Sequence, residues 1–133
     1  MAISEAHGLP IAFHVASASP AEVKLVEATL DDRFLPDYID RLLGDKAYDS
    51  DALDDMLMTK WGIEMIARHR RNRKVPTQDG RPLRRYRRRW KIERLFAWCH
   101  NYRRLVTRWE VKPENFLAMW HLAAMLILVR QLL

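Results

Sequence analysis

The sequence predicts a mixed α/β fold that contains a pair of parallel strands. Hydrophobic residues make up 49% of the 133 residues, which is enough to bury the core of about one ordinary domain. Between residues 41 and 67, two short apolar segments flank a helical segment, and strand, helix and strand in this order form a βαβ unit. The two strands of such a unit run parallel, because the helix carries the chain back to the edge where it started.

Residues 1–17 are expected to form a β-hairpin, because two short β-type segments flank a turn marked by Gly8 and Pro10. A helix should follow this hairpin. Residues 19–22 have the sequence of a capping box with proline at the first helical position, so the helix is expected to begin there and to run to about Asp31.

The βαβ-like unit spans residues 41–67. Its first strand ends at Asp45, and its helix is expected to be capped by Asp49 or Ser50. Gly62 should end that helix, since glycine readily adopts the left-handed conformation found at helix C-termini. The second strand follows this glycine directly.

A basic loop is expected at residues 68–83, which contain two prolines and an Asp-Gly pair. Residues 84–107 should then form one long basic helix, and residues 113–132 a last helix that is apolar nearly all round and therefore buried. The apolar run of this last helix is shorter than the roughly 20 residues that span a membrane. The long helix carries apolar side chains at steps of three and four, at Ile92, Leu95, Phe96, Cys99, Tyr102 and Val106.

Charge is distributed unevenly along the chain. Residues 68–108 carry sixteen lysines and arginines against two acidic residues, Asp79 and Glu93, whereas the rest carries seven basic and fifteen acidic residues. The overall formal charge of +6 therefore hides a strongly cationic segment. Such a segment favours a polyanionic partner, above all nucleic acid. The alternative is a solvated, arginine-rich helix.

The chain has a single cysteine, Cys99, which supports neither a disulfide framework nor a four-ligand zinc site. A reducing compartment suits this composition, and no signal peptide opens the sequence. We therefore expect a cytoplasmic, nucleoid-associated protein without a membrane partner. Cys99 itself is expected in the core, on the apolar stripe of the long helix.

Glu93 is an isolated carboxylate among cations on this expected helix. Tyr86, Arg89 and His100 lie seven, four and seven residues away, and these steps place them on the same side of the helix as Glu93. A carboxylate in this position is either a metal ligand beside a polyanion or one half of a helix ion pair. An ion pair with an arginine one turn away would contribute only about 0.2–0.5 kcal/mol.

Asp45 is the second candidate, because it follows a buried strand at the edge where open α/β sheets place their ligands. The alternative is an aspartate that forms a turn, which is the commoner role for this residue type. Asp45 and Glu93 together are more informative than either alone. Carboxylates from a strand end and from a helix, brought together over a basic surface, would make a Mg²⁺ site for phosphoryl chemistry.

Two segments resemble the DDE transposases of bacterial insertion sequences. Residues 44–50, Gly-Asp-Lys-Ala-Tyr-Asp-Ser, are similar to the segment around the second catalytic aspartate of that family. The pattern Tyr86-x2-Arg89-x3-Glu93 is similar to the signature around the catalytic glutamate, and residues 88–98 fit as well. The resemblance covers nearly the whole chain. It is strongest to the insertion-sequence-five group, within the insertion-sequence-four class.

The resemblance implies a ribonuclease H-like fold and Mg²⁺-dependent nicking and joining of DNA. Asp45 and Glu93 would then be two of three catalytic carboxylates, and both would bind Mg²⁺. His100 stands where the family often has a lysine. The resemblance also implies DNA-binding residues, four of them on a mobile loop (Arg70, Arg71, Arg73 and Lys74) and the others at Arg85, Tyr86, Arg88, Arg89, His100, Arg103 and Arg104.

The first catalytic aspartate of the family lies on the first, central strand of the sheet, and residues 1–4 resemble the second strand. We therefore expect the C-terminal portion of a catalytic domain, with an incomplete fold whose first, central strand is missing. Such a fragment should be inactive alone. Its partners would be DNA and an upstream transposase half or full-length transposase subunits. The alternative is a non-catalytic DNA-binding or subunit-poisoning regulator of transposition.

Overall fold

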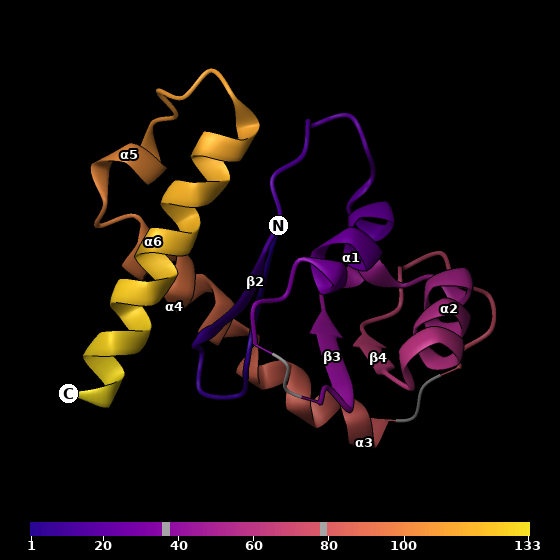
Figure 1. The fold of residues 1–133 in the computed structure, drawn as a ribbon. Coiled ribbons are helices and arrows are strands. Elements are labelled where there is room, and N and C mark those ends of the chain that lie inside the picture. Colours follow the sequence, from indigo (N-terminus) through magenta and orange to yellow (C-terminus); the bar gives the residue numbers. More distant parts are fainter. Residues whose placement is uncertain (36–37, 78–79) are drawn as a thin grey trace. The chain divides into compact units, whose positions relative to one another are not determined.

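The structure, a computed structural model, describes residues 1–35, 38–77 and 80–133. The chain divides into two compact units. Residues 1–36 together with 90–133 form the hairpin unit, and residues 37–89 form the βαβ unit. Each unit contains a two-stranded sheet with helices (Figure 1), which confirms a mixed α/β fold.

In the hairpin unit, β1 (Ala2–Ser4) pairs with β2 (Pro10–Phe13) in antiparallel register, which confirms the expected hairpin. Gly8 in the connecting turn has a φ of +91°, a conformation that side-chain-bearing residues rarely adopt. A Cβ atom there would also approach Arg94 Nη2 to 2.8 Å. The turn therefore requires glycine for its backbone conformation.

Helix α1 (Glu22–Asp31) begins later than the capping box predicts. Its N-cap is Ala21, which has an extended backbone and provides no side-chain cap. Ser19 consequently lies too far from the first helical turn to accept its N–H groups, and this prediction was wrong. Val26 and Leu30 are fully buried beneath the helix.

Residues 84–107 are not one helix, contrary to the prediction. They form the 3₁₀ helix η2 (Arg84–Arg89) and the α-helices α4 (Trp90–Cys99) and α5 (Arg103–Val106). Beyond α4 the backbone hydrogen bonds tighten to three-residue spacing, as when Asn101 N donates to Trp98 O at 3.2 Å. This tightening ends α4 and redirects the chain.

The redirection changes which apolar side chains reach the core. Leu105 on α5 is 4% exposed, whereas Val106, predicted on the buried stripe, is 60% exposed. Leu95 and Cys99 on α4 are fully buried, as predicted. Burial raises the pKa of the Cys99 thiol to about 11, so this thiol stays protonated at neutral pH.

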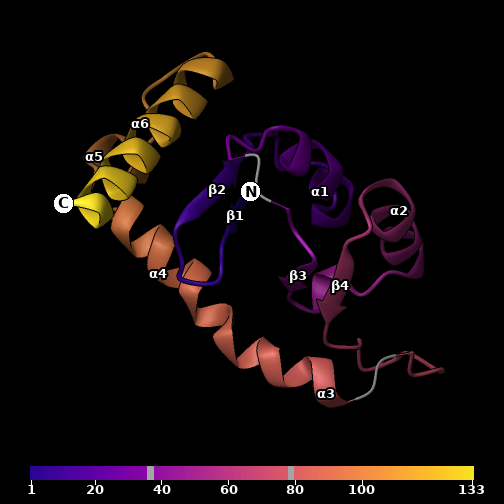
Figure 2. The ribbon, with the colours of Figure 1, turned by 60° about the horizontal axis from the view of Figure 1, so that its bottom comes forward.

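Helix α6 (Pro113–Leu132) is buried on one face only, although its apolar sequence predicts burial all round. Ala123, Ala124 and Ile127 pack into the cluster that contains Leu95 and Phe13. Figure 2 shows α6 beside α5, with which it is in contact. The opposite face meets no further layer among the residues that the structure describes, and it exposes Leu122, Met125, Leu126 and Val129.

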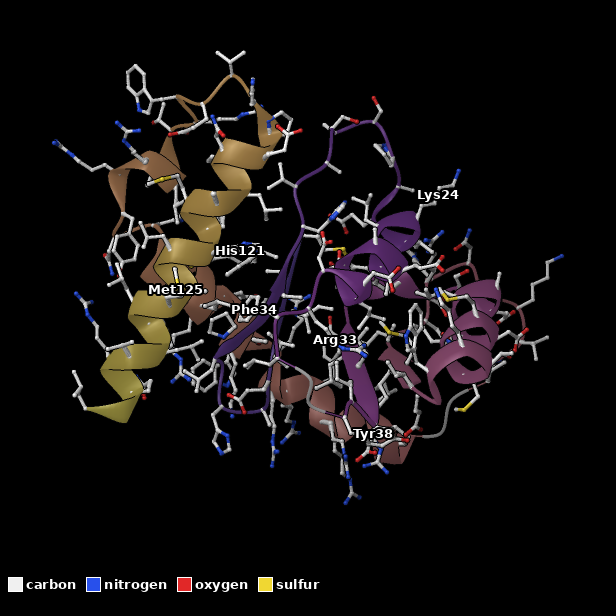
Figure 3. The ribbon with its side chains drawn as sticks, viewed as in Figure 1. Lys24, Arg33, Phe34, Tyr38, His121 and Met125 are labelled. Atoms are coloured by element: carbon white, nitrogen blue, oxygen red, sulfur yellow. The ribbon has the colours of Figure 1, made fainter. Side chains whose placement is uncertain are left out.

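Aromatic side chains join α6 to the rest of the hairpin unit. Phe13 and Trp120 have ring centroids 5.1 Å apart, and Phe34 meets the edge of His121 at 5.8 Å. Figure 3 shows Phe34 and His121 lying close to each other, with Met125 further along the helix. Within the described ranges, no helix has the length and hydropathy of a membrane span.

The βαβ unit has the predicted topology. Strands β3 (Arg41–Gly44) and β4 (Glu64–Ala67) pair in parallel, and α2 (Asp51–Trp61) connects them. Ser50 caps α2 by accepting a hydrogen bond from Leu53 N, and Gly62 ends the helix with a φ of +67°. The helix-capping residues and the apolar segments of residues 41–67 therefore predicted the structure of this unit correctly.

The expected basic loop at residues 68–83 ends earlier than predicted. Residues 68–77 form turns without regular structure, but α3 (Gly80–Leu83) adds a short helix directly before η2. Residues 78–79 of the expected loop, including Asp79, lie outside the described residues. A further 3₁₀ turn, η1 (Lys46–Tyr48), follows β3.

Candidate nucleic-acid and metal site

Along the arginine run of η2 (Arg84–Arg89), every third side chain is half-buried and the others are exposed. Tyr86 and Arg89 are half-buried, whereas the other four residues, Arg84, Arg85, Arg87 and Arg88, are exposed. A 3₁₀ helix has three residues per turn, so side chains three apart lie above one another. The helix therefore presents two exposed rows of arginines, 84 with 87 and 85 with 88, and a third row of Tyr86 with Arg89 that faces inward.

Tyr86 organises the inward row. Arg89 Nη1 donates a hydrogen bond to the Tyr86 hydroxyl at 3.0 Å, and the Arg89 guanidinium lies 5.3 Å from the ring centroid. The Arg68 guanidinium lies 5.2 Å from the same ring. Both cations are within the range of cation–π attraction. Arg89, predicted to bind DNA, is thus also a partner of Tyr86 within the chain.

The four cations predicted on the loop differ in their surroundings. Arg71 and Lys74 are exposed. Arg73 forms ion pairs with Asp49 and Asp51, and its side chain is only 14% exposed. Arg70 donates from Nε to Lys46 O at 3.2 Å and from Nη2 to Ala47 O at 2.9 Å. The loop is therefore bonded to η1 and to the start of α2.

Asp45 directly follows β3 and is half-buried, at the strand end where the sequence places it. Its Oδ1 atom accepts a hydrogen bond from Ala47 N at 2.7 Å, and it is the N-cap of η1. The turn-forming role, left open by the sequence, is therefore present. This hydrogen bond does not prevent a carboxylate from coordinating a metal, because each oxygen has two lone pairs.

Glu93 lies exposed in the first turn of α4. In the next turn, the Arg94 guanidinium packs between Trp90 and Trp98, 4.9 Å and 4.7 Å from their ring centroids. Arg94 also donates a hydrogen bond to His7 O in the hairpin turn. These contacts attach the α4 segment around Glu93 to the hairpin.

The remaining predicted DNA-binding residues follow α4. His100 lies just beyond its last residue, so it does not continue a helical row with Tyr86 and Glu93. Arg103 and Arg104 are exposed on α5. Arg104 Nη1 donates to Glu110 Oε1 at 3.1 Å, a surface pair that is expected to be weak.

A family model described as the transposase DDE domain matches residues 1–128. The chain belongs to the DDE transposase domain family. No curated protein and no solved structure matches it significantly. Membership supports a transposase function in general, a ribonuclease H-like fold and DNA as the substrate. The family generally uses divalent metal ions.

The two candidate metal ligands of this transposase domain belong to different units, Asp45 to the βαβ unit and Glu93 to the hairpin unit. Their oxygen donors suit Mg²⁺ chemically. However, no group of three or more His, Cys, Asp or Glu residues that could hold a metal ion exists among the described residues.

Sequence reasoning missed the role of Asp49, which it treated only as a possible helix cap. The side chain is 4% exposed and accepts hydrogen bonds from three groups of the basic loop. A signal was present in the sequence. Asp49, Asp51, Asp54 and Asp55 form an acidic cluster that precedes an arginine-rich loop, and such opposite charges favour contact between the two segments.

Asp54, in the same cluster, gives a pH-dependent prediction. Its burial, and then the nearby Asp51 carboxylate, raise its pKa to about 6. The folded state therefore binds a proton more tightly than the unfolded state, and stability should fall as pH rises from about 4 to about 6. Asp54→Asn should therefore stabilise the chain at pH 7, by about 1 kcal/mol or less because the partly exposed group is screened by water.

Thermal unfolding at pH 4, 5, 6 and 7 would measure this effect. The difference between Asp54→Asn and the unchanged chain should be near zero at pH 4 and should grow up to pH 6. Asp55→Asn, an exposed neighbour with the same loss of charge, is the control. A difference that does not vary with pH would contradict the prediction.

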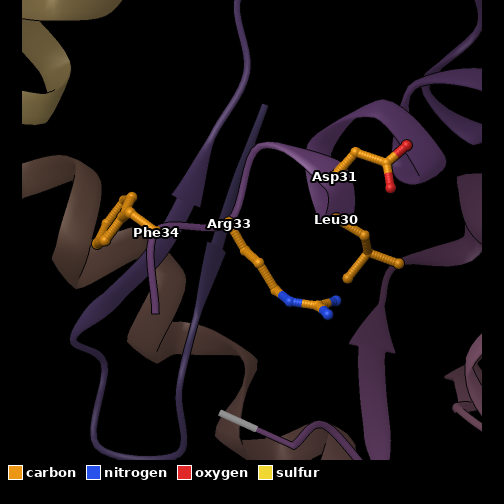
Figure 4. A pocket seen from close by; sticks show the side chains of 4 residues that line it. All are labelled: Leu30, Asp31, Arg33 and Phe34. Carbon is orange, nitrogen blue, oxygen red and sulfur yellow. The ribbon is translucent and has the colours of Figure 1, made fainter. Parts of the chain in front are cut away.

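Neither of two hollows in the hairpin unit gathers the predicted site residues. One, of about 350 Å³, is lined by Leu30, Asp31, Arg33 and Phe34. Figure 4 shows the side chains of Leu30 and Arg33 facing each other, with the Asp31 carboxylate pointing away. The other, of about 210 Å³, has a mainly apolar, aromatic lining that includes Phe96 and Trp120.

Proposed function

We propose that this chain is the C-terminal portion of a transposase of the insertion-sequence-five group, and that η2 binds transposon-end DNA. The observation that carries this proposal is the pair of exposed arginine rows on a short helix within a DDE transposase domain. Arginines bind phosphates through paired N–H groups, so a row of them can follow a DNA backbone. Tyr86 would hold Arg89 in place beside these rows.

We propose further that Asp45 and Glu93 are two of the three carboxylates that bind Mg²⁺ in the assembled transposase. The ion, when bound, would act as a Lewis acid on the scissile phosphate. The third carboxylate would be supplied by a partner. The partner would be an upstream transposase half or a full-length transposase subunit.

We propose that this partner binds at the edges of the sheets. Each has two strands, β1 with β2 and β3 with β4, so each has an outer edge without a further strand in the described chain. On β3, the side chains of Leu42 and Leu43 are only half-buried. An added strand would pair the edge hydrogen-bonding groups and cover apolar surface.

The test is a cleavage and strand-transfer assay with labelled insertion-sequence end DNA and Mg²⁺. The purified chain should bind the DNA and show little or no nicking or strand transfer. Robust Mg²⁺-dependent cleavage by the chain alone, abolished by Glu93→Gln, would overturn the proposed need for a partner. An unchanged chain that does not bind DNA would overturn the DNA-binding role of η2.

A regulator that binds DNA or poisons transposase subunits without catalysis is the second candidate function. The cationic segment favours it, because such a segment can bind DNA without any metal site. In this case Glu93→Gln would leave inhibition of transposition in cells unchanged. Substitution of Arg85, Arg88 and Arg89 by alanine would remove that inhibition together with DNA binding.

A further inference from the structure

Asp49 is a nearly buried carboxylate with no place in the metal chemistry above. It lies between η1 and α2, and its side chain is 4% exposed. Its Oδ2 atom accepts from Arg70 N at 2.7 Å. Its Oδ1 atom is paired with His69 Nδ1 at 2.9 Å and accepts from Arg73 Nη1 at 2.6 Å. Three donors from one five-residue stretch of the loop therefore converge on a single carboxylate.

The hydrogen bonds of His69 and Arg73 close the loop on itself. Thr77 N donates to His69 Nε2 at 3.1 Å, so this nitrogen is the acceptor and the ring proton is on Nδ1, where it can be donated to Asp49. Arg73 donates from Nε to Val75 O at 2.9 Å and from Nη2 to Thr77 Oγ1 at 3.1 Å. The loop is thus organised around Asp49 as far as Thr77.

The same network reaches the turn that carries Asp45. Arg70, whose backbone N–H binds Asp49, donates its guanidinium N–H groups to the carbonyls of Lys46 and Ala47 in η1. Asp45 is the N-cap of that same turn and receives the N–H of Ala47. The basic loop and the Asp45 turn therefore form one hydrogen-bonded assembly within the βαβ unit.

We propose that Asp49 is a positioning residue, which folds residues 69–77 against the Asp45 turn, so that Arg70 binds the carbonyls of η1 and Arg73 binds Asp49. Arg71 and Lys74, which are exposed, are then the loop cations that contact DNA phosphates. This assignment rests on the proposed DNA-binding function, whereas the role of Asp49 in the loop does not. Arg73, predicted from sequence to bind DNA, becomes an internal ion-pair partner.

The charge state of Asp49 agrees with this role. Burial by itself would raise the pKa of Asp49. The hydrogen bonds from Arg70 N and His69, together with the charge of Arg73, outweigh burial and lower that pKa below its usual value. The carboxylate is therefore ionised at neutral pH, and replacing it by an amide removes one of the two carboxylate charges that hold Arg73, the other being that of Asp51.

The first test is limited trypsin digestion combined with NMR of the His69 side chain. In Asp49→Asn, cleavage after Arg70, Arg71 and Lys74 should be at least about tenfold faster than in the unchanged chain, because the loop opens more often. The Nδ1–H signal of His69 should be lost. Asp55→Asn, an exposed acid on α2 with the same charge change, should alter neither readout. Unchanged cleavage and an unchanged His69 signal in Asp49→Asn would overturn the proposal.

The second test distinguishes Arg73, which binds Asp49, from Arg71 and Lys74, which are proposed to contact DNA. Arg73→Ala should accelerate cleavage after Arg70 and Arg71 as Asp49→Asn does, and the double variant should add little, because both changes break one network. Joint substitution of Arg71 and Lys74 by alanine should weaken DNA binding about tenfold and leave the cleavage rate after Arg70 unchanged. The proposal would be overturned if Arg73→Ala weakened DNA binding without accelerating cleavage.

If the unchanged chain binds no DNA, the proposed function fails, and the first test still decides the role of Asp49.

Discussion

Leu95→Ala is expected to lower the free energy of unfolding of the hairpin unit by about 3 kcal/mol, within the range for buried leucines. Leu95 is fully buried and belongs to the cluster that joins Phe13 of β2 to Ala124 and Ile127 of α6. Truncation removes buried methyl groups and leaves a cavity among β2, α4 and α6. A loss of this size is a large part of the stability of a small domain.

Urea unfolding, followed by circular dichroism, would measure the effect. The control is Leu122→Ala on α6, which is the same chemical change at a side chain that is 46% exposed. This control should cost about 1 kcal/mol or less, because little apolar area returns to water. Equal losses for the two variants would show that α4 does not pack as the structure has it.

Joint substitution of Arg85 and Arg88 by alanine is expected to weaken DNA binding by at least about tenfold near 0.1 M salt, and to reduce the salt slope by about 2. These two side chains form one exposed row of η2, so both can reach the same DNA backbone. Each phosphate contact releases counterions, and losing two contacts lowers both affinity and its salt dependence. Fluorescence anisotropy with labelled end DNA, over a series of salt concentrations, measures both quantities.

The matched control is joint substitution of Arg84 and Arg87, the other exposed row of the same helix. It removes the same charge from the same turns. A smaller loss in this control would assign the contact to the row of residues 85 and 88. Equal losses in both pairs would mean that the total charge of η2, rather than one row of arginines, sets the affinity.

The fold was predictable where neighbouring residues decide it. The βαβ unit is correct because its signals are local, with Ser50 at one end of α2 and Gly62 at the other. The single helix over residues 84–107 was wrong because apolar spacing of three and four does not distinguish one α-helix from a 3₁₀ helix followed by two short α-helices. The all-round burial of α6 was wrong because composition gives apolarity, not the number of packing partners.

The site was predictable only in part. The position of Asp45 follows from the strand that precedes it, and the pairing of Tyr86 with Arg89 is consistent with their spacing of three. The roles of Arg70 and Arg73 were not predictable from the loop itself. Their partners lie more than twenty residues earlier in the chain, and charge density alone does not separate a cation that faces DNA from one that faces a buried carboxylate.

The sequence by itself determined the family, the hairpin, the βαβ unit and the cationic segment that contains Glu93, because these depend on local pattern and on composition. Only the tertiary structure decided how that segment is divided. It placed the arginine run of residues 84–89 on a helix with two exposed rows, and it set Glu93 on a separate α-helix. It also drew Arg73 onto Asp49. The physical reason is that hydrogen bonds and ion pairs between distant residues, not the charge of each residue, determine which cations remain exposed to solvent and to DNA.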